Sequence, residues 1–486
     1  MWLDGRLPLG ERFDVGVEAT SRSSSVTRAL LFVPSRWGGG GRVRRSSVAF
    51  AVSVLLLSSP ALAEDGLDLS GSFRARYEAI DNQARVGFDN ADALLNLRTI
   101  LTAEYRGDGF RAGAELYDSR VYLADAGTPV TTSEVNAFEL VQAWIAADLA
   151  SPLGAGTSAT VQAGRFTLNL GSRRLVAADD YRNTTSGYTG LRTDLNFDAG
   201  TRATLIYVLP QVRLPDDNAA LRDNRAAWDR ESFDLVLWGG LASKTRAIGE
   251  TTAEVSFYHL GERDAPGRPT RNRSLETLGL RFIRDPKAER WDHEIEVISQ
   301  WGNVRASLAN NAPVRDVSAW FVHADVGYTF ASGWKPRVSA EFDYASGDRG
   351  GGSVNRFDTL FGMRRADFAP SGIYSAIGRA NILTPAVRIE AAPSRRLDLF
   401  VNYRLMWLAS RTDSFATTGV RDAAGNSGRF AGQQFEGRAR WWVAPEKLRF
   451  EATGALLRKG RFLKTAPNAT GGGDTRYISL NLTAFF

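Results

Sequence analysis

Apolar and polar side chains alternate strictly along many segments of this 486-residue chain. In residues 337–345, valine, alanine, phenylalanine and tyrosine alternate with arginine, serine, glutamate and aspartate, and residues 317–330 and 397–405 repeat the pattern. Successive side chains of a strand point to opposite faces, so each segment would have one apolar and one charged face. From Leu67 onward no apolar pattern of helical period is sustained. The alternation therefore predicts an all-β protein.

The predicted strands are long. Soluble sheets usually have strands of about 5 to 6 residues, whereas tilted membrane strands need roughly 9 to 11. We predict about eighteen strands, over residues 67–80, 93–106, 110–123, 137–149, 158–168, 187–196, 201–209, 232–239, 251–260, 274–283, 291–302, 317–330, 335–345, 382–391, 397–408, 433–443, 447–458 and 476–486.

The predicted connections alternate between short and long. Tight turns are expected at residues 106–109, 198–200, 331–334, 393–395 and 444–446, and long links at 171–186, 211–230, 346–381 and 409–432. Outer-membrane barrels have short periplasmic turns and long extracellular loops. We therefore predict a transmembrane antiparallel β-barrel with both termini in the periplasm. The link at 241–250 is longer than this rule allows, which leaves the strand count open by two.

The last ten residues also fit a membrane barrel. Residues 477–486 alternate and end in Phe486, which resembles the terminal signal read by the barrel assembly machinery; an ordinary edge strand is the alternative. Trp441 and Trp442 lie near a predicted turn, where interfacial aromatic residues belong. We expect outer-membrane lipid and lipopolysaccharide to surround the barrel, in the cell outer membrane of a Gram-negative bacterium.

The N-terminal region predicts export. Arg42, Arg44 and Arg45 precede an apolar run over residues 48–57 and a small-residue stop at residues 61–63, the pattern of a secretory signal peptide. We assign residues 43–63 to the signal peptide and residues 64–486 to the barrel. Residues 1–42 are expected to be a non-native or misannotated extension, with translation starting at Val43 through a non-ATG codon. N-terminal sequencing of the precursor tests this.

Composition excludes several classes of function. The chain has no cysteine, so thiolate metal sites, disulfides and a cysteine nucleophile are excluded. Of its 60 basic and 54 acidic residues, 8 and 4 lie in residues 1–63, so the mature chain has 52 and 50 and a net charge of +2. This small excess gives no reason to expect nucleic acid as a partner. No metal-ligand cluster or cofactor motif occurs, so we expect neither metal nor cofactor.

If the apolar faces contact lipid, the charged faces line a water-filled lumen. Alternation places twelve arginines there: Arg74, Arg76, Arg98, Arg111, Arg202, Arg281, Arg337, Arg388, Arg404, Arg438, Arg440 and Arg449. We expect about two-thirds of the lumen arginines to form stiffening ion pairs with wall acids. The others would offer bidentate donors to passing carboxylates at a constriction, and the pairs 438/440 and 74/76 are the best candidates. The loop at 346–381 is either an inward-folded constriction loop or a solvated external loop.

Several motifs together resemble the alginate export porin family. They are Arg74-Ala75-Arg76-Tyr77-Glu78, residues 115–120, Gln142-Ala143-Trp144, Gly164-Arg165-Phe166 with residues 171–175, Ser346-Gly347-Asp348, and residues 356–362. The resemblance extends over essentially the whole mature chain. Phe166 departs from the pattern, because many members have glutamine there.

The resemblance implies an eighteen-stranded, monomeric barrel with an electropositive pore that conducts a polyuronate, with possible periplasmic export partners. Carried over by position, the implied pore residues are Arg74, Arg98, Arg165, Arg174 and Arg438, with Glu115 and Asp118 as acidic counterweights. Alternation places Arg165 on the lipid side, so its role in the pore requires a bulge at Gly164.

Enzymatic readings have little support. The histidines are His259, His293 and His323, and none begins an H-x-S arrangement. His323 and Asp325 share a face and could imitate a catalytic dyad, but a hydrogen-bonded lumen histidine is the simpler interpretation. We therefore predict a passive channel without catalytic residues that conducts an anionic saccharide such as alginate. The alternatives are a general or uptake porin for small solutes and, with less support, an outer-membrane hydrolase.

Overall fold

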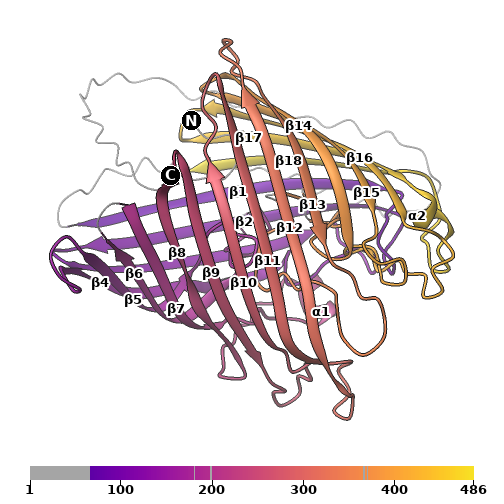
Figure 1. The fold of residues 1–486 in the computed structure, drawn as a ribbon, viewed down its shortest axis with the longest axis horizontal. Coiled ribbons are helices and arrows are strands. Elements are labelled where there is room, and N and C mark those ends of the chain that lie inside the picture. Colours follow the sequence, from indigo (N-terminus) through magenta and orange to yellow (C-terminus); the bar gives the residue numbers. More distant parts are fainter. Residues whose placement is uncertain (1–65, 180, 198–199, 365–366, 369, 371) are drawn as a thin grey trace. The chain divides into compact units, whose positions relative to one another are not determined.

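The computed structural model describes residues 66–486 except 180, 198–199, 365–366, 369 and 371; the predicted signal peptide and N-terminal extension lie outside this part of the chain. Eighteen strands and two short helices make up the regular structure (Figure 1). Their bounds are β1 Leu67–Asp81, β2 Ala91–Arg106, β3 Phe110–Tyr122, β4 Asn136–Ala150, β5 Ser158–Thr167, β6 Gly187–Asn196, β7 Thr201–Pro210, α1 Asn218–Arg222, β8 Leu235–Ile248, β9 Thr251–Glu262, β10 Ser274–Arg284, β11 Arg290–Arg305, β12 Val314–Thr329, β13 Arg337–Ala345, β14 Ile382–Ser394, β15 Leu397–Trp407, β16 Phe430–Ala444, β17 Leu448–Lys459, α2 Arg461–Thr465 and β18 Thr475–Phe485.

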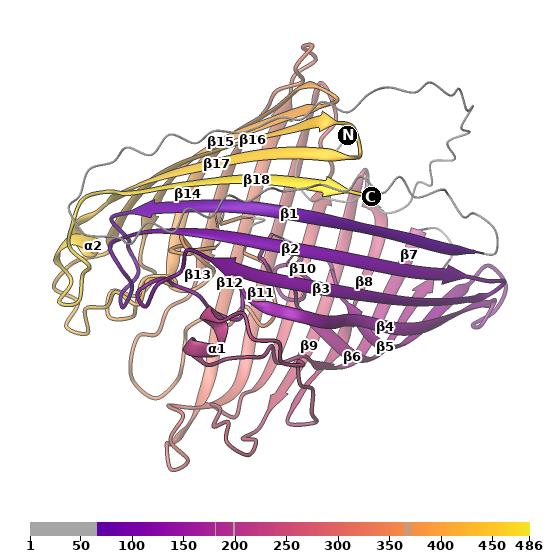
Figure 2. The same ribbon diagram turned by 180° about the vertical axis from the view of Figure 1, so that it is seen from behind.

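The strands form one closed antiparallel barrel. Each strand pairs with its neighbours in the sequence, and β1 pairs with both β2 and β18. Figure 2 shows this closure, with β18 lying beside β1. The predicted barrel of about eighteen strands is confirmed. Because a closed barrel has no free edge, the alternative of a C-terminal edge strand is wrong.

The eighth strand differs from its prediction. It was expected at residues 232–239, followed by a long link, but β8 runs from Leu235 to Ile248 and only Gly249 and Glu250 separate it from β9. Gly239 and Gly240 interrupt the alternation yet remain paired with both neighbours. A Cβ on Gly239 would lie 2.0 Å from the carbonyl oxygen of Phe257, so this close approach requires glycine. The long link at 241–250 is therefore wrong, and the count of eighteen holds.

Short and long connections lie at opposite ends of the barrel. The links that follow even-numbered strands are short, from two residues at 249–250 to seven at 151–157 and 330–336. The links that follow odd-numbered strands include residues 168–186, 211–234, 346–381 and 408–429. The start of β1 and the end of β18 lie at the end with the short turns. This asymmetry agrees with the prediction.

The outer face is apolar and has aromatic side chains near both ends. Trp291, Trp334 and Trp441 are about half exposed or more near the short turns, and Trp301 and Trp320 are similarly exposed toward the long loops. Aromatic girdles of this kind border the lipid-facing band of membrane barrels. Neither helix of the described chain has the length and apolar character that a membrane-spanning helix requires.

Two of the long loops fill the lumen instead of extending into solvent. Leu168, Leu175 and Val176 of the loop 168–186 are buried, as are Phe368 and Ile373 of the loop 346–381. These side chains belong to a single apolar cluster that also includes inward residues of many strands. We refer to residues 168–186 as loop A and to residues 346–381 as loop B. The inward-folded alternative for residues 346–381 is therefore the one observed.

Candidate functional site

Loops A and B pair with each other through their backbones. The Phe361 amide donates to the Leu175 carbonyl at 2.9 Å, and the Ala177 amide donates to the Phe361 carbonyl at 3.1 Å. A third bond joins the Met363 amide to the Arg173 carbonyl at 3.0 Å. Residue 362 has to be glycine here, because a Cβ would lie 1.8 Å from the nearest loop A carbonyl oxygen. The two loops therefore form one connected element inside the barrel.

Three of the predicted pore arginines attach loop A to the wall. Arg74 of β1 donates to the carbonyls of Tyr181, at 3.1 Å, and Arg182, at 2.7 Å. Arg76 donates to the Tyr181 carbonyl at 2.6 Å, and Arg98 of β2 donates to the Arg182 carbonyl at 3.0 Å. These guanidinium groups hold loop backbone, so their observed contacts are structural.

Asn183 provides a second attachment of loop A. Its side-chain amide donates to the carbonyls of Leu97, Arg120 and Glu134 at 3.1, 3.2 and 2.9 Å. The side chain is fully buried. Since these carbonyls belong to β2, β3 and the link between β3 and β4, one side chain joins loop A to three chain segments.

Arg174 and Asp367 join the two loops at an ionic centre. Arg174 Nε and Nη2 donate to the two carboxylate oxygens of Asp367, each at 2.8 Å. Arg379 Nε donates to the same carboxylate at 2.9 Å, and its Nη2 makes a further contact. Arg174 Nη1 contacts Glu294 and Glu296 of β11 at 2.6 and 2.5 Å. We call Arg174 and Arg379 the arginine clamp.

The charges of the clamp stabilise one another. Burial raises the pKa of the Asp367 carboxyl, but the guanidinium groups of Arg174 and Arg379 outweigh this effect and hold that pKa well below its usual range. Burial lowers the pKa of Arg174, whereas Asp367, Glu294 and Glu296 raise it well above its usual value. Asp367 and Arg174 therefore remain charged at neutral pH. A buried ionic group of this kind is costly to leave without its partner.

Loop B crosses the lumen to the opposite wall. The Tyr374 hydroxyl contacts the Gln434 amide oxygen, and its ring lies 5.5 Å from the ring of Tyr477 on β18. Gly372 lies against the Glu78 carboxylate of β1. On the other side, the Gln300 amide of β11 donates to the Asp358 carbonyl at 2.8 Å. Loop B thus contacts strands on both sides of the barrel.

Three further predicted lumen arginines contact wall acids. Arg337 contacts Asp292 and Asp325, and Arg388 donates to Glu390 at 2.7 Å. Arg404 lies 3.6 Å from Glu341 and donates to the backbone carbonyl of loop B residue 367 at 2.8 Å. Each of these arginines stiffens the wall or holds a loop.

Arg438 and Arg440 share one acid. They lie 2.9 and 2.8 Å from the two carboxylate oxygens of Asp398 on β15. The Arg438 guanidinium also lies over the ring of Phe400, 4.8 Å from its centroid. The hypothesis that this pair is displaced from its acids is therefore wrong, because strand register places Asp398 directly opposite Arg440 and within reach of Arg438.

The two predicted acidic counterweights lie on opposite faces of β3. Glu115 accepts from the Thr102 hydroxyl at 3.1 Å and from the Gln142 amide at 2.9 Å, without an arginine. Asp118 has the opposite alternation and pairs with Arg120 at 2.9 Å. Residues an odd number of positions apart along a strand point to opposite faces, and Asp118 is three positions after Glu115. Asp118 therefore does not join Glu115 in the lumen.

Arg165 also falls on the outward alternation. Both ladders of β5 keep their register across Gly164, so the bulge that a pore role requires is absent. Arg165 is directly opposite Ala143 and Thr189, two residues from Ile145 and Leu191, which are more than half exposed. Its guanidinium pairs with Glu139 and Glu231 at 2.8 and 3.1 Å. The predicted role of Arg165 in the pore is contradicted.

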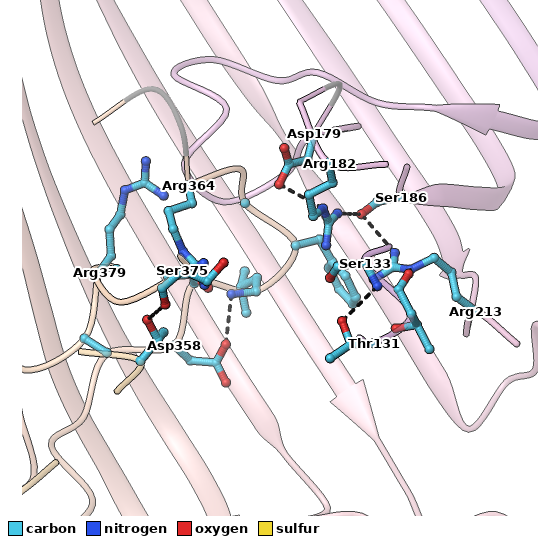
Figure 3. A pocket seen from close by; sticks show the side chains of 18 of the residues that line it. Thr131, Ser133, Asp179, Arg182, Ser186, Arg213, Asp358, Arg364, Ser375 and Arg379 are labelled. Atoms are coloured by element: carbon cyan, nitrogen blue, oxygen red, sulfur yellow. Dashed lines mark hydrogen bonds and ion pairs between the residues drawn. The ribbon is translucent and has the colours of Figure 1, made fainter. Parts of the chain in front are cut away.

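A cavity of about 830 Å³ lies among the long loops and is lined partly by loops A and B. Nine arginines and four acidic residues line it in the described chain (Figure 3). Five of these arginines contact acids, whereas Arg85, Arg213, Arg271 and Arg364 have no acid contact among the residues described. The arginines that lack acid partners are thus in loops, where strand alternation could not have indicated them.

Burial and neighbouring positive charges lower the pKa of two cavity arginines. Burial, together with the Arg182 guanidinium, lowers the pKa of Arg213 to about 10. Burial, together with Arg85, also lowers the pKa of Arg364 to about 10. Within the described part of the chain, Arg213 donates to neutral oxygens, those of Thr132, Thr185 and Ser186, and to no carboxylate. Both groups remain protonated at neutral pH, so the cavity is electropositive and suited to anions.

Two histidine–acid pairs occur, and neither resembles a catalytic site. His323 Nδ1 lies 2.7 Å from Asp343, not Asp325 as the sequence suggested, and no described hydroxyl contacts its ring. His259 Nδ1 lies 3.1 Å from Glu276 on the outer face. The predicted hydrogen-bonded lumen histidine is confirmed. Side-chain atoms of His323, Asp343 and Asp367 lie within 4.8 Å of one another, but the arginine clamp already neutralises Asp367, which does not fit a metal site.

Comparison with known proteins places this geometry in context. The family model described as alginate export matches residues 65–474. No curated protein matches the sequence. Among solved structures, OccAB3 of Acinetobacter baumannii is 12% identical with a TM-score of 0.54, covering 86% of this chain and 99% of its own. OccK2 (OpdF) of Pseudomonas aeruginosa, solved in complex with glucuronate, is 13% identical with a TM-score of 0.53, covering 86% and 98%. At these sequence identities, the similarity to the solved structures shows a shared fold and nothing about function.

Proposed function

Because the chain belongs to the alginate export family, we propose that it is a passive outer-membrane channel selective for anionic saccharides. The observation that carries this proposal is the cavity among the long loops, with its nine arginines and four acids. Four of those arginines have no acid contact among the described residues. Guanidinium groups recognise carboxylates through paired, planar hydrogen bonds, so uronates are the saccharides that this lining would favour.

The charged cavity supports passive conduction. Four of its arginines lack an acid contact among the described residues, and charges of this kind are too costly to leave without water. A passive barrel takes its direction from the concentration gradient and its periplasmic partners. The same channel could therefore export or take up its solute.

One observation favours a second candidate, a porin for small anionic solutes. Loops A and B pair with each other and contact the barrel wall, and a cavity of about 830 Å³ is lined partly by these two loops. A cavity of that size suits a small ligand. Passage of a polymer would require the loops to move, whereas a single uronate needs less displacement.

Planar bilayer recording tests both candidates. The mature protein is refolded, and its reversal potential is measured in a potassium chloride gradient. Anion selectivity together with current block by oligo-mannuronate or oligo-guluronate supports a polyuronate channel, and block by monomeric uronate alone supports the small-solute porin. Equal permeability to both ions without any block would refute the proposed anion selectivity.

A further inference from the structure

The arginine clamp holds a carboxylate that belongs to a loop and not to the barrel wall. Asp367 of loop B receives paired donors from Arg174 at 2.8 Å and a further donor from Arg379 at 2.9 Å. Bidentate donation to a planar carboxylate is how arginine binds carboxylate ligands in general. We propose that this clamp is a carboxylate-binding site of the channel, occupied here by Asp367, for which a uronate carboxylate competes.

The clamp would keep its shape if Asp367 left. Arg174 Nη1 is held by Glu294 and Glu296 of the barrel wall, so its guanidinium keeps two wall contacts when the Asp367 carboxylate is withdrawn. The departure of Asp367 frees the Nε and Nη2 donors of the same guanidinium. Arg379 donates through Nη1 to the Met363 carbonyl and has no second acid among the described residues. An incoming carboxylate would satisfy both arginines.

The clamp can be reached from the electropositive cavity. Arg379 lines that cavity, as does Arg364, three residues before Asp367. Figure 3 shows both guanidinium groups at one side of the pocket. Next to Arg379, Asn381 anchors the end of loop B by donating to the carbonyls of Ser410 and Ser414 at 3.0 Å. A saccharide in the cavity therefore meets Arg379 before it meets Arg174.

Competition for the clamp would couple binding to movement of loop B. Arg404 donates to the Asp367 carbonyl at 2.8 Å, and its guanidinium lies 5.2 Å from the Phe368 ring. Displacing the Asp367 side chain therefore strains these contacts as well. A tethered competitor acts at a high effective concentration, on the order of millimolar or above, so it weakens the apparent affinity of a free carboxylate.

The first experiment compares Asp367→Asn with Asp348→Asn, which removes a loop B carboxylate that accepts from the Gly350 amide at 3.3 Å and lies outside both the clamp and the cavity lining. The half-blocking concentration of digalacturonate is measured in single-channel recordings. We expect Asp367→Asn to lower it by roughly tenfold or more, with Asp348→Asn within about twofold of the parent. Asp367→Glu, which keeps the charge, should behave as the parent does.

These outcomes separate this inference, which rests on the proposed function, from that function itself. Anion selectivity and uronate block with no change in Asp367→Asn would overturn the clamp alone. A channel without anion preference or block in either form would overturn both.

A second measurement leaves the clamp intact. The chain has no native cysteine, so Ala376→Cys, fully buried in loop B, provides a single thiol. Uronate should accelerate its reaction with a water-soluble maleimide, and a rate independent of uronate would contradict the inference.

Discussion

Removing Arg213 and Arg364 should reduce anion selectivity by an amount that the cavity dimensions predict. Both arginines line the cavity, and neither contacts an acid in the described part of the chain. A sphere of the cavity's volume has a radius of about 6 Å, so in water each charge stabilises a central anion by roughly 0.7 kcal/mol. Screening leaves about 0.6 kcal/mol at 0.01 M salt and about 0.3 kcal/mol at 0.15 M.

The permeability ratio responds to twice this energy, because a cation loses what an anion gains. Each replacement by glutamine should lower the anion-to-cation ratio by about sevenfold at 0.01 M salt and about threefold at 0.15 M. The reversal potential in a potassium chloride gradient measures the ratio directly. Arg225→Gln is the matched control, since Arg225 is an exposed residue of the same link as Arg213 and does not line the cavity.

Two results would refute this reasoning. Either the reversal potential stays unchanged in Arg213→Gln and Arg364→Gln, or Arg225→Gln shifts it by the same amount. A shift that did not weaken with salt would show that the two side chains act through structure instead of charge.

Three further predictions concern the loops and the wall. Asn183→Leu removes donors to three carbonyls, so it should weaken the attachment of loop A by roughly 2 to 3 kcal/mol and speed its cleavage by protease. Burial and a neighbouring glutamate raise the pKa of Asp229 to about 7, above its unfolded value near 4. The folded link 211–234 is therefore favoured at low pH, and its stability falls by roughly 4 kcal/mol as the pH rises from about 4 to about 7. Limited proteolysis of that link between pH 5 and 8 should show the loss, and Asp229→Asn should abolish it. Gly239→Ala should lower the thermal unfolding midpoint of the barrel, measured by the shift in gel mobility on heating. The backbone conformation at residue 239 alone costs a residue with a side chain about 1 to 3 kcal/mol. Gly437→Ala should leave the midpoint unchanged, because a Cβ at residue 437 has room.

Each of these predictions has a contrary result. Unchanged cleavage in Asn183→Leu would mean that the other attachments of loop A suffice. A protease profile that is flat with pH in the parent would contradict the raised pKa of Asp229. Equal midpoints for the two glycine variants would contradict the close approach at Gly239.

Strand alternation predicted the barrel well because one face of each strand must contact lipid. That constraint acts on every second residue, so strand positions, closure and the inward arginines could be inferred without contacts. It failed at β8, where Gly239 and Gly240 have no side chains to alternate. It also indicated correctly that Arg165 points outward, against the role implied by family resemblance.

The candidate site could be predicted only in part because it lies mainly in loops. Loop residues such as Arg213 and Arg379 obey no period, and their neighbours are distant in sequence. Arginines expected to be displaced from acids, such as Arg438 and Arg440, meet Asp398 through strand register. The sequence predicted where charges face, whereas which charges meet depended on the fold.

The backbone bridge between loops A and B has a consequence for electrical recordings. Three hydrogen bonds between residues 173–177 and 361–363 join the loops, so neither can swing away while the other stays in place. Separating the two loops breaks all three hydrogen bonds together, and a partial displacement of either loop opens little of the lumen. Opening should therefore be all-or-none, and current through one molecule should jump between two discrete levels instead of drifting across a continuum.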